Sequence, residues 1–303
     1  MQHTRSGFPP AIVCVACNGG IQGRESHPAL PETAEQIADS VYYAYQAGAS
    51  MVHAHARNPK DLTQGARVAD HWKSLDAMIR ERCPDIIINY TTGGDLEMTM
   101  TERISSLSAK PEIASLNLTP DMSRFRLKQR DAPLPNPRDE REIDCCIPFT
   151  YGIIEQFAAE MKKRGIKPEL EIYHPGGAWV IRNLIEKKLI APPYLIQTVM
   201  GAQTASYPTP ENLLQIVKEF PPGAIWLCSG IGPFQLPMIT MGAIMGGHIR
   251  VGLEDNLYLR RGQQFKDNAD AVRWAVRICT ELNREVATPN QARAILGLPS
   301  SVC

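Results

Sequence analysis

The sequence predicts an α/β protein whose single domain, residues 1–303, is a (β/α)8 TIM barrel. Short apolar runs alternate with amphipathic stretches along nearly the whole chain, which is typical of repeated strand–helix units. Several runs are continuous in Val, Ile and Leu, as expected for strands covered on both faces in a parallel sheet. Eight such units favour a closed barrel. An open doubly wound sheet is the alternative, but its glycine-rich first turn is only partly matched by Cys17-Asn18-Gly19-Gly20.

The predicted strands are the short apolar runs themselves. In chain order they are AIVCVAC at 11–17, SMVHAHA at 50–56, IIINY at 86–90, IASLN at 113–117, LEIY at 170–173, LIQTVM at 195–200, AIWLC at 224–228 and HIRVG at 248–252. The stretches after them have helical spacing of their apolar residues. We therefore expect helices at about 33–47, 67–82, 95–107, 151–164, 178–188, 210–219, 233–245 and 266–284.

The helix ends carry recognisable capping residues. Thr33 followed by Gln36 can form a capping box at the start of the first helix. Thr288 before Pro289 combines an N-cap residue with a proline at the first helical position, which predicts a C-terminal helical extension. Gly165 stands where the fourth helix should stop.

One segment interrupts the alternation of strands and helices. Residues 119–150 are charged and contain several prolines, and we expect them to form a long loop. A loop of this length in a compact domain is usually functional or flexible. Its basic residues Arg124, Arg126, Lys128 and Arg130 would suit a polyphosphate ligand, although such a run is more often a solvated surface.

The composition excludes several classes of protein. Among 303 residues, 32 are Lys or Arg and 32 are Asp or Glu, so the formal net charge is zero, and 44% of residues are hydrophobic. This apolar content argues against intrinsic disorder, and the balanced charge argues against a dedicated nucleic-acid binder. No apolar run approaches the roughly 20 residues of a membrane helix. The first residues lack the layout of a signal peptide, so we expect a cytoplasmic protein whose eight cysteines are reduced.

His53 and His55 are the first candidates for chemistry. Residues two apart in a strand point to the same face, so both imidazoles would lie together at the end of the second predicted strand. Two imidazoles supply half of a metal site that suits zinc, and the active sites of barrels lie at this end of the strands. The alternative is a pair of histidines with an ordinary structural role.

The last predicted strand supplies the remaining groups. Glu254 could complete a His2Glu metal site, and Asp255 could act as a general base. Arg250 could keep Asp255 ionised or stabilise an enolate. In a closed barrel the eighth strand is separated from the second by the first strand alone. The alternative is an acidic pair that caps a helix, beside a surface arginine.

A second group of polar residues follows the third, fourth and fifth predicted strands. Hydroxyl and glycine N–H groups at a helix start can bind a carboxylate or phosphate, although a plain tight turn fits the same motif. Other polar residues stand where apolar ones would be expected at the end of a strand. A glutamate in the fifth strand would point inward, where it needs a partner, or outward into solvent. These candidates are Thr91, Thr92, Gly93 and Gly94, then Ser115 and Asn117, and finally Glu171.

Taken together, these segments resemble the beta-keto acid cleavage enzyme family, whose first characterised activity was 3-keto-5-aminohexanoate cleavage. The resemblance runs from Ala16-Cys17-Asn18-Gly19 to Ala287-Thr288-Pro289. Its most specific pieces are His53-Ala54-His55-Ala56-Arg57, Thr91-Thr92-Gly93-Gly94, Ala114-Ser115-Leu116-Asn117, Pro168-Glu169-Leu170-Glu171 and the run from Gly246 to Asn256. The resemblance implies a zinc-bearing barrel, usually a homotetramer, that converts a β-keto acid and acetyl-CoA into acetoacetate and a new acyl-CoA.

The resemblance also implies a role for each candidate residue. His53, His55 and Glu254 would hold one Zn²⁺ per subunit. Asp255, helped by Arg250, would remove a proton from the keto acid, and the carbanion would attack the thioester of acetyl-CoA before a retro-Claisen cleavage. The substrate carboxylate would be bound by Thr91, Thr92, Gly93, Gly94 and Ser115, with Asn117 beside them, and Glu171 would line the site.

One departure from the family pattern concerns the substrate. The relative that cleaves an amino-substituted keto acid has a glutamate just after the first strand, and we align Gly20 with it. An acidic or neutral keto acid is therefore expected here. Two other hypotheses remain: a different metal-dependent barrel aldolase or hydrolase acting on a small carboxylate, and a non-catalytic barrel that binds small molecules.

Overall fold

The computed structural model describes residues 7–95 and 97–300 and confirms the predicted barrel. Eight parallel strands close on themselves in the order β1-β12-β11-β10-β9-β6-β5-β2. They are β1 (Val13–Ala16), β2 (Met51–Ala54), β5 (Ile87–Tyr90), β6 (Ile113–Asn117), β9 (Lys167–Ile172), β10 (Tyr194–Met200), β11 (Ala224–Gly230) and β12 (His248–Val251). All eight fall within or beside the predicted apolar runs, because burial on both faces selects such runs.

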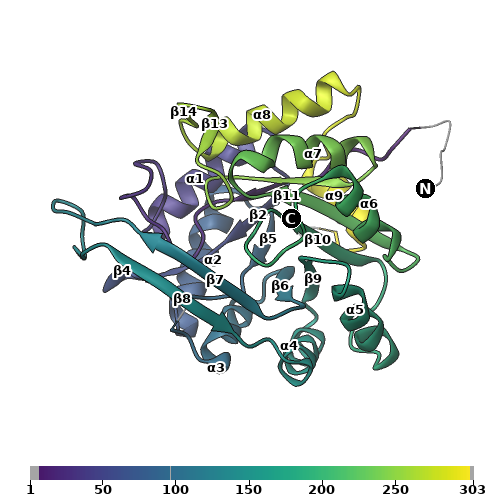
Figure 1. Ribbon diagram of the computed structural model, residues 1–303, viewed down its shortest axis with the longest axis horizontal. Coiled ribbons are helices and arrows are strands. Elements are labelled where there is room, and N and C mark those ends of the chain that lie inside the picture. Colours follow the sequence, from purple (N-terminus) through teal and green to yellow (C-terminus); the bar gives the residue numbers. More distant parts are fainter. Residues whose placement is uncertain (1–6, 96, 301–303) are drawn as a thin grey trace.

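Helices lie outside the ring of strands (Figure 1). They are α1 (Ala34–Gln46), α2 (Ala69–Arg82), α3 (Met100–Arg103), α4 (Tyr151–Arg164), α5 (Gly177–Glu186), α6 (Pro210–Lys218), α7 (Gln235–Ile244), α8 (Asn268–Glu281) and α9 (Pro289–Leu296). The capping box between Thr33 and Gln36 is present, and Gly165 ends α4 in the left-handed conformation. The helix expected at 95–107 is instead the short α3 followed by a 3-10 helix, Ile104–Ala109. No described helix is long and apolar enough to cross a membrane.

The segment expected as a long loop contains a β-hairpin. Strands β7 (Asp121–Leu127) and β8 (Arg141–Ile147) pair antiparallel, and the hairpin extends away from the barrel strands (Figure 1). Two smaller hairpins, β3 (Arg57–Asn58) with β4 (Asp61–Gly65) and β13 (Tyr258–Arg260) with β14 (Gln263–Gln264), also lie outside the barrel ring. Their strands are partly exposed and polar, so they lack the apolar signal that marks the barrel strands.

The barrel interior changes from apolar to polar along its axis. At the amino ends of the strands, inward side chains such as Ile12, Met51, Ile87 and Leu195 pack against the C-terminal extension, whose α9 contributes Leu296. Further along the same strands, the inward positions become polar. These are His53, Asn89, Ser115, Asn117, Glu169, Glu171, Gln197 and Arg250. The barrel therefore has a sealed apolar end and a polar end that opens to a cavity.

Candidate active site

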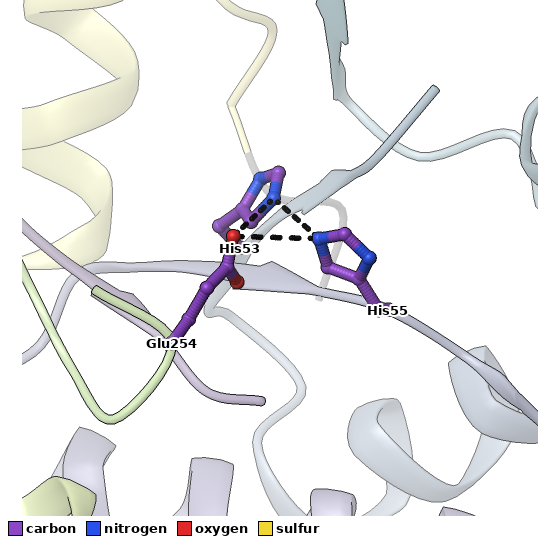
Figure 2. Close-up of side chains that lie close together, drawn as sticks. All are labelled: His53, His55 and Glu254. Carbon is purple, nitrogen blue, oxygen red and sulfur yellow. Dashed lines mark hydrogen bonds and ion pairs between the residues drawn. The ribbon is translucent and has the colours of Figure 1, made fainter. Parts of the chain in front are cut away.

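His53, His55 and Glu254 converge at the carboxyl end of the barrel (Figure 2). The two histidine Nε2 atoms are 3.2 Å apart, and Glu254 Oε1 lies 3.7 Å from His53 Nε2 and 3.4 Å from His55 Nε2. Their candidate ligand atoms all lie within 4.8 Å of one another. Two imidazoles and one carboxylate are the donor set of open zinc sites, in which a further position is left for substrate. These three residues thus fit a divalent metal.

The local backbone explains why Glu254 reaches the two histidines. Strand β1 pairs with β2 on one side and with β12 on the other, so the ends of β2 and β12 lie one strand apart. Gly252 has a φ of 142°, and a Cβ there would overlap the Ala16 carbonyl oxygen. Only glycine permits this close approach. The Glu254 N–H then donates to the same Ala16 carbonyl at 3.2 Å, which fixes the start of the loop.

Within the triad of His53, His55 and Glu254, the protonation states of His53 and Glu254 suit metal binding. Burial lowers the pKa of His53 well below its ordinary value, so the imidazole is neutral and has a lone pair available. Burial raises the pKa of Glu254, but the charges of His55 and Arg250 outweigh it and hold that pKa well below the ordinary value. A neutral imidazole and an ionised carboxylate are the protonation states that a metal ligand requires.

Arg250 and Asp255 form a buried bidentate pair beside the triad. Arg250 Nε donates to Asp255 Oδ2 and Arg250 Nη2 donates to Asp255 Oδ1, both at 2.9 Å. Arg250 Nη2 also reaches Glu254 Oε1 at 2.8 Å, and Nη1 lies 3.5 Å from Glu171 Oε1. Burial lowers the pKa of Arg250, but Asp255 and Glu254 raise it well above its usual value, so the guanidinium stays charged.

Two carboxyl groups of the site are shifted toward neutrality. Burial raises the pKa of Asp255 more than Arg250 lowers it, which makes this carboxylate a stronger base than an exposed aspartate. Burial also raises the pKa of Glu171 to about 8, against the opposing effect of Arg250. Glu171 is therefore largely protonated at neutral pH and can donate a hydrogen bond. Such divergent shifts are typical of acid–base sites.

The predicted anion-binding residues divide into two layers. Thr91, Gly93, Gly94 and Asn117 line the cavity, and we call this group the cradle. Because Thr91 Oγ1 accepts the Gly93 N–H at 2.9 Å, its own hydroxyl proton remains available to a ligand. Thr92 and Ser115 do not line the cavity. They lie behind it and bind each other, with the Thr92 hydroxyl donating to the Ser115 carbonyl at 2.6 Å and the Thr92 N–H donating to Ser115 Oγ at 3.3 Å.

Tyr173 is a member of the site that the sequence analysis missed. Its hydroxyl donates to Asn117 Oδ1 at 2.7 Å, which leaves the Asn117 amide protons for the cradle. A Cβ added at Gly93 would lie 3.3 Å from Asn117 Nδ2, so these protons are beside the glycine turn. The two-residue period of a strand could have identified Tyr173, because it follows Glu171 by two residues and so shares its inward face.

A cavity of about 710 Å³ joins the triad, the Arg250–Asp255 pair and the cradle. The β7–β8 hairpin and its continuation form part of its wall through Phe125, Leu127, Arg126 and Lys128. Of the basic cluster, Arg126 pairs with Glu140, whereas the Arg130 side chain is fully buried.

Arg130 anchors the hairpin to the loop after β1. Its Nη1 lies 2.7 Å from both Glu25 Oε2 and Glu32 Oε1, and its Nη2 donates to Glu32 Oε2 at 2.9 Å. Arg138, on the other side of the hairpin, donates to Glu25 as well. These pairs hold the segment that was expected as a loop against the rim of the barrel.

The model of the beta-keto acid cleavage enzyme family matches residues 10–298. The chain belongs to this family. It is 33% identical to the 3-keto-5-aminohexanoate cleavage enzyme of Fusobacterium nucleatum, over 95% of this chain and 97% of that protein. It is also 33% identical to the 3-oxoadipate:acetyl-CoA acetyltransferase of Cupriavidus necator, over 96% of each. The apo structure of ObcA shares the fold, with a TM-score of 0.71 and 17% identity, covering 91% of this chain and 66% of ObcA.

Gly20 lies where the loop after β1 passes close to two other parts of the site. A Cβ at Gly20 would lie 2.6 Å from the Gly94 carbonyl oxygen and 3.2 Å from His55 Nδ1. No residue larger than glycine fits this backbone at position 20. Any side chain that the loop after β1 presents to the cavity must therefore belong to a neighbouring residue. Ile21 and Gln22 occupy the cavity wall there. Ile21 and Gln22 offer no carboxylate for a cationic substrate at these positions.

Proposed function

We propose that the protein is a zinc-dependent beta-keto acid cleavage enzyme that converts a β-keto acid and acetyl-CoA into acetoacetate and a new acyl-CoA. The observation that carries this proposal is the position of His53, His55 and Glu254 next to the buried Arg250–Asp255 pair. Membership of the family supports the reaction class. The name of the Cupriavidus necator relative, an acetyl-CoA acetyltransferase, supports acetyl-CoA as the second substrate.

The cradle would bind and orient the keto acid. The Thr91 hydroxyl, the Asn117 amide and the glycine turn offer donors to the substrate carboxylate. This orientation would bring the carbon between the carboxylate and the ketone toward Asp255, which lowers the entropic cost of reaching a reactive geometry. When bound by His53, His55 and Glu254, zinc would supply Lewis acidity that polarises the ketone.

Asp255 then acts as the base. Its carboxylate takes a proton from C2 of the keto acid, and Arg250 stays charged beside it and stabilises negative charge at the site. The C2 carbanion attacks the acetyl-CoA carbonyl, a C–C bond forms and the coenzyme A thiolate leaves. The thiolate adds to the original ketone, and the bond from that carbon to C2 breaks. The electron pair returns to C2 and takes the proton back from Asp255, which gives acetoacetate and the new acyl-CoA.

The loop after β1 bears on the side chain of the substrate. Gly20 carries no side chain, and Ile21 and Gln22 are uncharged, so an acidic or neutral keto acid is proposed over a cationic one. The names of the relatives include both kinds, an amino-substituted acid and 3-oxoadipate. A homotetramer in the cytoplasm is part of the same proposal.

The test is mass spectrometry of acyl-CoA products from purified protein, acetyl-CoA and a panel of β-keto acids that vary in length and charge. We expect a new acyl-CoA together with acetoacetate, and loss of both with His53→Ala. The fully exposed Asp70→Asn on α2 is the control and should retain activity. Turnover of a keto acid without any CoA ester would favour a metal-dependent aldolase or hydrolase. An unchanged metal content and activity in His53→Ala would refute the proposed site.

A further inference from the structure

Two polar side chains inside the barrel have no part in the proposed mechanism. Asn89 lies on β5 and Glu169 lies on β9, and both are fully buried. Asn89 Nδ2 donates to Glu169 Oε2 at 2.6 Å. Burying an amide and a carboxyl group costs free energy unless their polar atoms find partners. Asn89 lies on the strand next to β2, which carries His53, and this position indicates a role for the pair at the metal-binding triad.

His53 has a geometric requirement that this pair can meet. Its Nε2 faces His55 Nε2 and Glu254 Oε1, so Nε2 is the atom available to a metal. A neutral imidazole has one N–H, which must then be on Nδ1. Histidines that bind metals nearly always donate this second N–H to a carbonyl or carboxylate, which fixes the tautomer and the ring orientation.

Asn89 is the register neighbour of His53, since β2 pairs with β5 at these two residues. Among the described residues, His53 Nδ1 and Asn89 Oδ1 each lack a hydrogen bond of standard geometry. The Nδ1–H of His53, a donor that needs an acceptor, thus lies on the strand next to Asn89 Oδ1, an acceptor that is not in use.

Glu169 determines which end of the Asn89 amide faces His53. Because Glu169 Oε2 accepts from Asn89 Nδ2, the amide oxygen is left for the histidine. The reverse orientation would set the amide N–H groups against the Nδ1–H of His53, two donors facing each other. We propose that Glu169 and Asn89 are positioning residues that hold His53 in the tautomer with Nε2 toward the metal. This inference rests on the proposed function, because it takes the triad to be a metal site.

The test measures Zn²⁺ affinity, so that it does not depend on turnover. The metal is removed from the full-length protein, and Zn²⁺ is titrated in competition with a chromophoric chelator. Asn89→Leu removes the acceptor, and we expect its Kd for Zn²⁺ to rise roughly 10- to 100-fold. Asn89→Asp should restore the affinity, because one carboxyl oxygen can share a proton with Glu169 while the other accepts from His53.

Two further variants keep the test decisive. Glu169→Met removes the acceptor that orients the Asn89 amide, so it should also weaken Zn²⁺ binding, and it serves if Asn89→Leu does not fold. Gln197→Leu is the matched control. Gln197 is fully buried in the same barrel, but its amide donates to the Thr198 carbonyl. The Zn²⁺ affinity of the Gln197→Leu variant should equal that of the wild type.

The outcomes separate this inference from the proposed function. Wild-type affinity in folded Asn89→Leu or Glu169→Met overturns the positioning role, and so does an equal loss in Gln197→Leu. If the wild type binds Zn²⁺ and His53→Ala does not, the metal site stands whatever the fate of Asn89. If the wild type does not bind Zn²⁺, both the metal site and the positioning role fail.

Discussion

His248 should make the protein sensitive to mild acid. This residue begins β12, is 3% exposed, and its Nδ1 accepts the Ile12 N–H at 3.0 Å. The bond joins the start of β12 to the residue before β1, where the barrel closes. Burial, with a smaller effect of the nearby Arg284 charge, lowers the pKa of His248 from 6.5 to about 3. The folded protein therefore holds this imidazole neutral at a pH at which the unfolded chain protonates it.

The sign and size of the effect follow from linkage. When a group binds protons more readily in the unfolded chain, the free energy of unfolding falls as the pH falls below the unfolded pKa. Between pH 7 and pH 5 the lowered pKa of His248 predicts a loss of about 2 kcal/mol. The loss continues to grow until the pH approaches the folded value of about 3.

The assay compares the wild type with His248→Asn by urea unfolding at pH 7 and pH 5. The asparagine oxygen can still accept from Ile12, but the side chain no longer titrates. Carboxyl groups that titrate in both proteins cancel in the comparison. We expect the wild type to lose about 2 kcal/mol more than the variant over this interval. Equal losses in the two proteins would refute the buried neutral histidine.

Three other substitutions probe the site and its frame. Asp255→Asn removes the base, so kcat for acyl-CoA formation should fall roughly 10²- to 10⁴-fold while Zn²⁺ still binds; a normal kcat would exclude Asp255 as the base. Arg130→Met leaves Glu32 charged and buried, so urea unfolding should show a loss of about 3–5 kcal/mol, and a loss near zero would contradict the anchoring role. Gly20→Ala forces a Cβ against the Gly94 carbonyl, so steady-state kinetics should show a higher KM for the keto acid, and an unchanged KM would contradict the close approach.

The barrel and the convergence of His53, His55 and Glu254 could be predicted because each depends on local pattern. A strand buried on both faces must be apolar along its length, which the eight runs are. His53 and His55 share a face through the two-residue period of a strand, and Glu254 follows the last strand, which lies one strand away in a closed barrel. The approach of Glu254 depends on Gly252 passing the Ala16 carbonyl, a contact between segments more than 200 residues apart in sequence.

What could not be predicted depends on partners distant in sequence. Thr92 and Ser115 looked like ligands for an anion, yet they bind each other behind the cradle, a pairing set by the β5–β6 register. The buried pair of Arg130 with Glu32 joins positions 98 apart, so one member of the basic run became an anchor, while Arg124 and Arg126 remain exposed. Composition cannot distinguish these outcomes, because the same side chains serve either role.

The charges of the site give an independent reason to expect a cation at the triad. Glu254 is held ionised, and Asp255 receives two N–H donors from Arg250, which favours its ionised form. One guanidinium therefore faces two carboxylates, while Glu171, with its pKa of about 8, adds little negative charge at neutral pH. Buried charge without compensation is expensive, and a divalent ion bound by His53, His55 and Glu254 would remove that cost. The same ion would balance the charge of Glu254, and Arg250 would then stabilise Asp255. Metal binding and proton transfer would therefore depend on separate positive charges.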